Sequence, residues 1–144
     1  RGRDNQTLTE YWEAGPRTYL GLQVAGFPNL FTVTGPGSPS VLSNMLVSIE
    51  QHIDWIARCV ADLAQRGMQT IEATTAAEDE WIAHVNEVAQ NTMFTAQSCN
   101  SWYLGANIPG EPRIFMPYVG GVGVYREKCD EVASNDYEGF LLRA

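Results

Sequence analysis

A run rich in glycine and proline, GPGSPS at positions 35–40, is the segment of this chain best suited to hold a ligand. Residues 30–34 before it predict a strand, and residues 43–66 after it predict a helix. A strand that enters a helix through a glycine turn points the unpaired amides of the helix N-terminus at the crevice beyond the strand ends, where they favour an anion. The spacing is neither GxGxxG nor a P-loop, so the pattern leaves a ligand site and a plain tight turn equally open.

A second run, SWYLGANIPG at positions 101–110, lies in a long irregular stretch that we expect over about residues 91–111. Its tryptophan, Trp102, has two interpretations. A tryptophan is more often part of a core than a ligand contact, but an indole N–H that needs an acceptor, carried on a hinged loop, also suits a lid over a polar ligand.

The other candidate residues favour structural roles. His52 falls beside the apolar face of a predicted helix, as a satisfied core histidine would, and His84 is predicted to face solvent. The glycines at 120–123 indicate a structural turn. The three cysteines lack the short spacing of a zinc site, so we predict no metal site and interpret them as free thiols in a reducing cytoplasm.

The elements that carry these segments predict an α/β fold. The helix over 43–66 has Ser43 as a candidate N-cap and Gly67 as a candidate C-cap, and its predicted buried stripe consists of Leu46, Ile49, Ile53, Ile56, Val60 and Leu63. A capping box starting at Thr75 predicts a second helix, with Glu78 as a first-turn charge. The other predicted elements are strands at 17–22 and 113–119, a helix to about residue 133 and a final apolar segment at 140–142.

Composition bounds the class of protein. The 144 residues are 44% hydrophobic and 18% charged, as in one globular domain. The net charge of −8 and the scattered basic residues argue against binding to nucleic acid. No run of about 18 apolar residues occurs, so we predict no membrane span. The N-terminus, with no initiator Met and no signal core, suggests a segment of a longer chain.

In addition, the sequence closely resembles type I Baeyer–Villiger monooxygenases, nearest to the phenylacetone, steroid and cyclopentadecanone group. The resemblance covers nearly the whole chain in order, through GPRTYLGL at 15–22, GFPNLF at 26–31, GPGSPS at 35–40, SNM at 43–45, IEQH at 49–52, SWY at 101–103, GANIPG at 105–110 and YEGF at 137–140. In that family FAD and NADPH act with O2 through a peroxyflavin to turn a ketone into an ester or lactone.

The resemblance also implies an organisation of the chain. Residues 1–70 would be the end of a doubly wound FAD-binding domain, and residues 71–144 a helical and irregular C-terminal extension with a mobile NADP-covering loop at about 91–111. Upstream FAD and NADP domains of the same enzyme would be its partners. The family's GxGxxG motifs and its catalytic arginine have no counterpart here, so we expect no catalytic residue in this segment and no activity from it alone.

Individual site residues follow from the matched runs. The resemblance implies that Met45 and Asn44 contact FAD at the helix start and that Trp102 reaches NADP. Ser40, Val41 and Leu42 would form a bulge beside the substrate pocket.

Two other classes stay open. The same turn and tryptophan would serve a non-catalytic ligand-binding or interaction domain. They would also serve another flavin oxidoreductase with two dinucleotide-binding domains.

Overall fold

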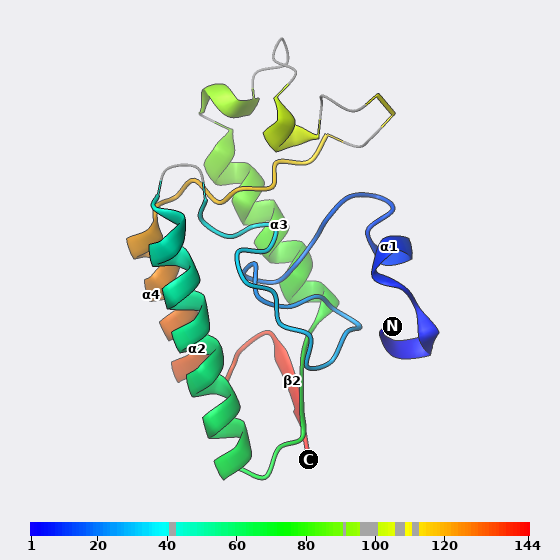
Figure 1. Cartoon of the computed structure of the whole chain (residues 1–144), viewed down its shortest axis with the longest axis vertical. Coiled ribbons are helices and arrows are strands. Elements are labelled where there is room, and N and C mark those ends of the chain that lie inside the picture. The colour runs from blue at the N-terminus through cyan, green and yellow to red at the C-terminus, as the bar shows by residue number, and fades with distance from the viewer. Residues whose placement is uncertain (41–42, 91, 96–100, 106–108, 111–112) are drawn as a thin grey trace.

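The computed structural model describes residues 1–40, 43–90, 92–95, 101–105, 109–110 and 113–144. α2 and α4 lie side by side, and β1 and β2 form a small antiparallel sheet beside the C-terminus (Figure 1). The mixed helix–strand class predicted from the sequence is confirmed. In chain order the elements are η1 (Arg3–Asn5), α1 (Leu8–Tyr11), α2 (Met45–Gln65), β1 (Thr70–Ala73), α3 (Thr75–Ala89), η2 (Met93–Thr95), η3 (Trp102–Leu104), α4 (Val122–Ser134) and β2 (Phe140–Arg143).

The long helix α2 has well-defined ends. Asn44 is its N-cap, because the Asn44 side-chain oxygen accepts a hydrogen bond from Leu46 N at 3.0 Å. The predicted cap, Ser43, is therefore one residue too early. At the other end, Gly67 adopts the left-handed φ of 69° that was expected of a C-cap.

The predicted buried stripe of α2 is wrong for three of its six residues, whereas Leu63 is buried and Ile56 packs against the core. Leu46, Ile53 and Val60 are 66%, 51% and 52% exposed. The face that packs within this chain is rotated about the helix axis from the predicted stripe, and it is partly polar. Its buried members are Ser48, Gln51, His52, Trp55, Cys59 and Leu63. Periodicity detected an apolar face correctly, but it did not indicate that this face lacks a partner among the described residues.

The hydrophobic core lies where α2, α3, α4 and β2 meet. Each of these elements contributes a buried aromatic side chain, namely Trp55, Trp81, Tyr125 and Phe140. The rings of Trp55 and Phe140 are 6.0 Å apart, and those of Trp81 and Tyr125 are 6.1 Å apart. Burying each such side chain stabilises the fold by about 1.5–3 kcal/mol.

The strands lie elsewhere than predicted. In the segments expected to be extended, the structure has only isolated bridges, from Tyr19 to Gln23, from Gln23 to Phe31 and, in parallel, from Pro39 to Tyr118. Tight turns interrupt the pairing there, and Leu20 has a left-handed φ of 58°. β1, which the sequence pattern did not reveal, pairs with β2 in the register Thr70 to Arg143 through Ala73 to Phe140.

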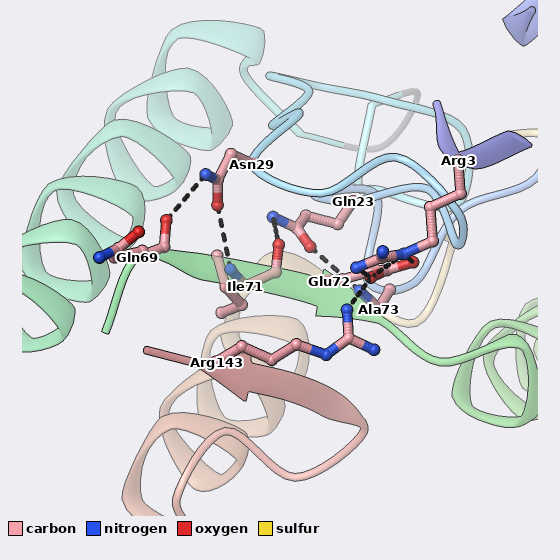
Figure 2. Close-up of polar contacts among 8 residues, drawn as sticks. All are labelled: Arg3, Gln23, Asn29, Gln69, Ile71, Glu72, Ala73 and Arg143. Carbon is pink, nitrogen blue, oxygen red and sulfur yellow. Dashed lines mark hydrogen bonds and ion pairs between the residues drawn. The ribbon is translucent and has the colours of Figure 1, made fainter. Parts of the chain in front are cut away.

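Side-chain amides occupy the second edge of β1 (Figure 2). Gln23 accepts from Ala73 N at 3.1 Å and donates to Ile71 O at 3.4 Å. Asn29 accepts from Ile71 N and donates to Gln69 O, each at 3.0 Å. These two amides complete hydrogen bonds that a third strand would otherwise make.

A single carboxylate joins distant parts of the chain. Glu72 on β1 is 5% exposed, and it binds Arg3 at 2.5 Å and Arg143 at 3.3 Å (Figure 2). The N-terminal segment, β1 and β2 therefore meet at one ion-pair cluster.

Glu78 is the first-turn charge of α3 that the sequence predicted, and it also binds three distant groups. The N-cap of α3 is Thr74, one residue before the predicted one, and Glu78 is fully buried. Its carboxylate accepts hydrogen bonds from Tyr11 Oη and Arg17 Nε, both at 2.6 Å, and from Ala25 N at 3.1 Å. Glu78 thus fixes the N-terminal loops against α3.

Candidate functional site

A pocket of about 220 Å³ brings together two segments that are far apart in the sequence. One wall is the Gly–Pro turn (residues 32–40), and the other is the Trp loop (residues 101–105) with a neighbouring extended segment. Ser40 and Trp102, both predicted as site residues, line it. Val41 and Leu42 lie outside the described residues. The remaining lining residues are Thr34, Gly35, Pro36, Ser38, Tyr103, Met116 and Pro117.

Hydrogen bonds fix the Gly–Pro turn to several other parts of the fold. Its backbone is bound by the loop before it, by α2, by α3 and by the segment after the Trp loop. The contacts are Thr32 Oγ1 to Gly21 O (2.8 Å), Thr18 Oγ1 to Pro36 O (2.5 Å), Thr34 N to His52 Nδ1 (2.9 Å), Trp81 Nε1 to Gly37 O (3.0 Å), Gly37 N to Met116 O (2.5 Å) and Tyr118 N to Ser38 O (2.9 Å).

Gly37 is required by the geometry of this turn. Its φ is 82°, a conformation that favours glycine. A Cβ atom added there would lie 2.9 Å from Trp81 Nε1. The glycine therefore permits the close approach through which Trp81 binds the turn.

The Trp loop presents Trp102 to the pocket rather than to the core. Ser101 caps the short helix η3, and Gly105 ends it with a φ of 66°. Leu104 is buried and Tyr103 packs edge-on against Phe94 at 5.7 Å, whereas Trp102 is 63% exposed. The interpretation of Trp102 as a core residue is wrong. Its indole N–H has no acceptor within the described part of the chain, which suits a ligand with an acceptor oxygen.

The start of α2 is a separate feature, because neither Met45 nor Asn44 lines the pocket. The Asn44 side chain acts as the N-cap and accepts a hydrogen bond from the amide of Leu46. The amide of Met45 has no acceptor among the described residues, and the Met45 side chain is 41% exposed. One free N–H at the positive end of a 21-residue helix fits an electron-rich edge of a cofactor such as FAD.

His52 is the satisfied core histidine that was predicted, and it contacts the site through Thr34. The side chain is fully buried. Nδ1 accepts from Thr34 N at 2.9 Å, and Nε2 lies 2.8 Å from Tyr125 Oη. Burial lowers the pKa of His52 to about 4, so the ring is neutral near pH 7. The sequence did not reveal this link, because nothing in the spacing pairs position 52 with position 34.

A larger pocket of about 710 Å³ lies between α3 and α4 and contains none of the predicted site residues. His84, exposed as predicted, lies on its wall. The rim carries four glutamates, which repel an anionic dinucleotide. They are Glu80, Glu127, Glu131 and Glu138.

Within the residues that the structure describes, no three His, Cys, Asp or Glu side chains are grouped so that they could hold a metal ion. None of the described helices is both long enough and apolar enough to span a bilayer.

Comparison with known proteins identifies relatives of this chain. No family model matches it. It is 42% identical to an acetone monooxygenase (methyl acetate-forming) of Gordonia sp. strain TY-5, 41% identical to a phenazine N-monooxygenase of Lysobacter antibioticus and 36% identical to a Baeyer–Villiger monooxygenase of Pseudooceanicola batsensis. These matches cover 98–100% of this chain. The chain spans about a quarter of the length of these curated relatives, 25–26%.

Solved structures agree with the sequence matches. An oxidized steroid monooxygenase bound to NADP has 48% identity and a TM-score of 0.89, and a cyclohexanone monooxygenase from Rhodococcus sp. Phi1 bound to NADP+ has 38% identity and a TM-score of 0.93. The OTEMO complex with FAD and NADP has 36% identity and a TM-score of 0.86. Each match covers 99–100% of this chain and 25–26% of the solved chain. The relatives named here are monooxygenases. In sequence and fold the chain is similar to the C-terminal part of Baeyer–Villiger monooxygenases.

Proposed function

We propose that this chain is the C-terminal part of a flavin-dependent Baeyer–Villiger monooxygenase that uses FAD, NADPH and O2 to insert one oxygen atom into a ketone, giving an ester or lactone. The observation that carries the proposal is the pocket that Ser40 and an exposed Trp102 both line. The resemblance assigns these two residues to the substrate and to NADP, respectively, so their meeting in one pocket supports both roles.

For this reaction the chain supplies binding and positioning rather than proton transfer. Trp102 binds NADP by donating its indole N–H to an acceptor on the dinucleotide. Ser40, with Val41 and Leu42, borders the ketone. The family's catalytic arginine has no counterpart among the residues matched here, so no residue of this chain is assigned a catalytic role.

FAD fits at the start of α2, where Met45 offers a free amide and Asn44 holds the first turn in shape. When bound and reduced, FAD supplies the activation of O2. Met45 then contributes a fixed positive partial charge toward the flavin. The Gly–Pro turn and the Trp loop form two walls of the pocket.

The exposed apolar stripe of α2 supports the division of the chain into two parts, one of which packs against upstream domains. Leu46, Ile53 and Val60 are half or more exposed, and a contiguous apolar surface of this kind suits packing against the upstream FAD and NADP domains. Residues 1–70 are assigned to the FAD-binding domain and residues 71–144 to the C-terminal extension, with the NADP-covering loop at about 91–111. β1 begins at this boundary and contacts both parts.

We also infer a cytoplasmic location. Cys59 and Cys129 are buried free thiols, and burial raises the pKa of both. Unpaired cysteines suit a reducing compartment.

The test uses the full enzyme that contains this segment. NADPH oxidation is followed with and without a panel of ketones, and products are identified by mass spectrometry. Ketone-stimulated oxidation with an ester or lactone product supports the proposal. A flavin-free preparation would instead favour a non-catalytic binding domain, and NADPH oxidation without oxygen insertion would favour another flavin oxidoreductase. N-oxides formed from phenazines in place of esters would favour N-oxygenation, the reaction named for one 41% identical relative.

A second measurement addresses the substrate pocket. Val41→Ala should change which ketones react, because the resemblance places this residue beside the substrate. The rate of flavin reduction by NADPH should stay close to that of the unmodified enzyme. Equal losses in both half-reactions would indicate a folding defect instead.

A further inference from the structure

We propose that His52 is a positioning residue for the pocket: it accepts the backbone N–H of Thr34 and so holds the Gly–Pro turn in the shape that the ketone and Trp102 require. This inference rests on the proposed function. It adds two residues outside the pocket, His52 and Tyr125, to those on which oxygen insertion depends.

Thr34 has a strained backbone conformation. Its φ is 54°, in the left-handed region that a β-branched residue rarely adopts. Thr34 lines the pocket and leads directly into Gly35 and Pro36, which line it too. Strained backbone of this kind persists only where surrounding contacts enforce it, and it concentrates at functional sites.

A hydrogen bond to His52 enforces this conformation. Thr34 N donates to His52 Nδ1 at 2.9 Å. A ring nitrogen that accepts carries no hydrogen, so the hydrogen of the neutral ring is on Nε2. Nε2–H therefore donates to Tyr125 Oη at 2.8 Å, and Tyr125 Oη–H donates to Leu20 O at 2.5 Å.

This hydrogen-bond chain is buried and complete. His52 and Tyr125 are 0% and 1% exposed, and each polar atom of the two side chains has a partner. Its members are His52 on α2, Tyr125 on α4, Thr34 in the turn and Leu20 in the loop before the turn. The position of Thr34 is therefore fixed relative to both helices, and a change at either side chain moves a pocket wall that neither one touches.

The hydrogen-bond chain is tested with two substitutions of His52, each of which keeps a polar atom near one of the two ring nitrogens. The amide of Asn in His52→Asn reaches the place of Nδ1 and can still accept from Thr34. The amide of Gln in His52→Gln reaches the place of Nε2 and can bind only Tyr125. Both remove the imidazole, so a purely structural role would affect both alike. His84→Gln, on the exposed histidine, is the control.

In the full enzyme we expect His52→Gln to raise KM for the ketone about tenfold and to increase hydrogen peroxide released per NADPH, because one hydrogen bond to the turn is lost. His52→Asn should keep KM within about twofold of the unmodified enzyme. Tyr125→Phe should fall between them, since the ring of His52 stays but its orientation is less fixed. The rate of flavin reduction by NADPH should not change in any of them.

Thr34→Gly keeps the proposal testable if His52→Gln folds poorly. Glycine adopts a φ of 54° without strain, so Thr34→Gly combined with His52→Gln should recover most of the loss in KM. The proposal is overturned if His52→Gln and His52→Asn have equal KM and equal coupling in the folded, FAD-loaded fraction, or if Thr34→Gly brings no recovery. Failure of the proposed function would look different, since the unmodified enzyme would then form no ester from any ketone.

Discussion

On one side of the pocket, the Gly–Pro turn is hydrogen-bonded to α2, to α3 and to two other segments. On the other side, the Trp loop is fixed through Leu104 and Tyr103, while Trp102 projects from it 63% exposed. One wall is therefore built to keep its shape, and the other carries a side chain free to meet a partner. A site that closes on a dinucleotide needs both, since the fixed wall defines the substrate position and the adaptable wall responds to the cofactor.

The most disruptive change should be one that forces the fixed wall apart. Gly37→Ala adds a Cβ that meets Trp81 at 2.9 Å, at a φ of 82°. We expect a loss of about 1–2 kcal/mol from the backbone and about 1–3 kcal/mol from the collision, measured by urea unfolding of the full enzyme. Gly110→Ala is the control, because Gly110 also has positive φ (89°) but no atom within 4 Å of the added Cβ. Equal losses would mean that the contact with Trp81 contributes nothing.

Acid should also loosen the fixed wall, through His52. The folded protein lowers the pKa of His52 from 6.5 to about 4, so between these values the unfolded chain binds more protons than the folded one. Stability therefore falls as pH drops through this window, by about 3 kcal/mol in total from this group. Comparing the pH dependence of urea unfolding for the unmodified enzyme and for His52→Gln isolates the contribution of His52. His84→Gln should retain the full dependence, and identical curves for the enzyme and His52→Gln would refute the assignment.

On the adaptable wall, the expected effect is on binding and not on stability. Trp102→Ala should weaken NADPH binding roughly tenfold, because an indole hydrogen bond and an aromatic contact together contribute about 1.4 kcal/mol. Hydrogen peroxide release should rise, and FAD content and melting temperature should barely change. Leu141→Ala on β2 removes another exposed side chain, outside both the pocket and the loop at 91–111, and should leave NADPH binding unchanged. Unfolding or loss of FAD with intact NADPH affinity would show that Trp102 has a structural role.

The smallest effect is predicted at the start of α2. Met45→Pro removes one amide donor at the first helical position, where proline is tolerated and where the extended Asn44 before it is compatible. A helix terminus contributes about 0.3–1 kcal/mol, so the two-electron flavin potential should fall by roughly 6–20 mV. Met45→Ala keeps the amide and should leave the potential unchanged. A potential that does not respond to Met45→Pro would exclude this amide from the flavin site.

Sequence patterns predicted the helices better than the strands. α2 was located to within two residues at each end because caps and periodicity are local signals. Its buried side was misjudged, since an apolar stripe reports that something packs there and not which part of a protein does so. The partner of Leu46, Ile53 and Val60 is not among the described residues, whereas Ser48 and His52 are buried through hydrogen bonds that periodicity ignores.

Long-range pairing accounts for most of the remaining errors. β1 is only four residues long and contains Glu72, so no run of alternating apolar residues marks it. Its partner β2 and its supporting amides lie about 40–70 residues away. The burial and the partners of Glu78 were not predicted for the same reason, because the partners come from the N-terminal loops. Within the site, family resemblance identified Ser40 and Trp102, which the structure brings together, but only coordinates could connect His52 to Thr34.

The amides of Gln23 and Asn29 along β1 have a consequence for how this region behaves at high concentration. An open strand edge is a template on which a second copy can add its own strand, the first step of edge-to-edge aggregation. Here the outward-facing groups of Ile71 and Ala73 are already bound by side chains that cannot propagate a ladder. Exchanging these two amides for apolar residues would leave Ile71 N and Ala73 N without these partners, while Asn29 N would still bind Ile71 O. The part of the edge left open would become a site of self-association.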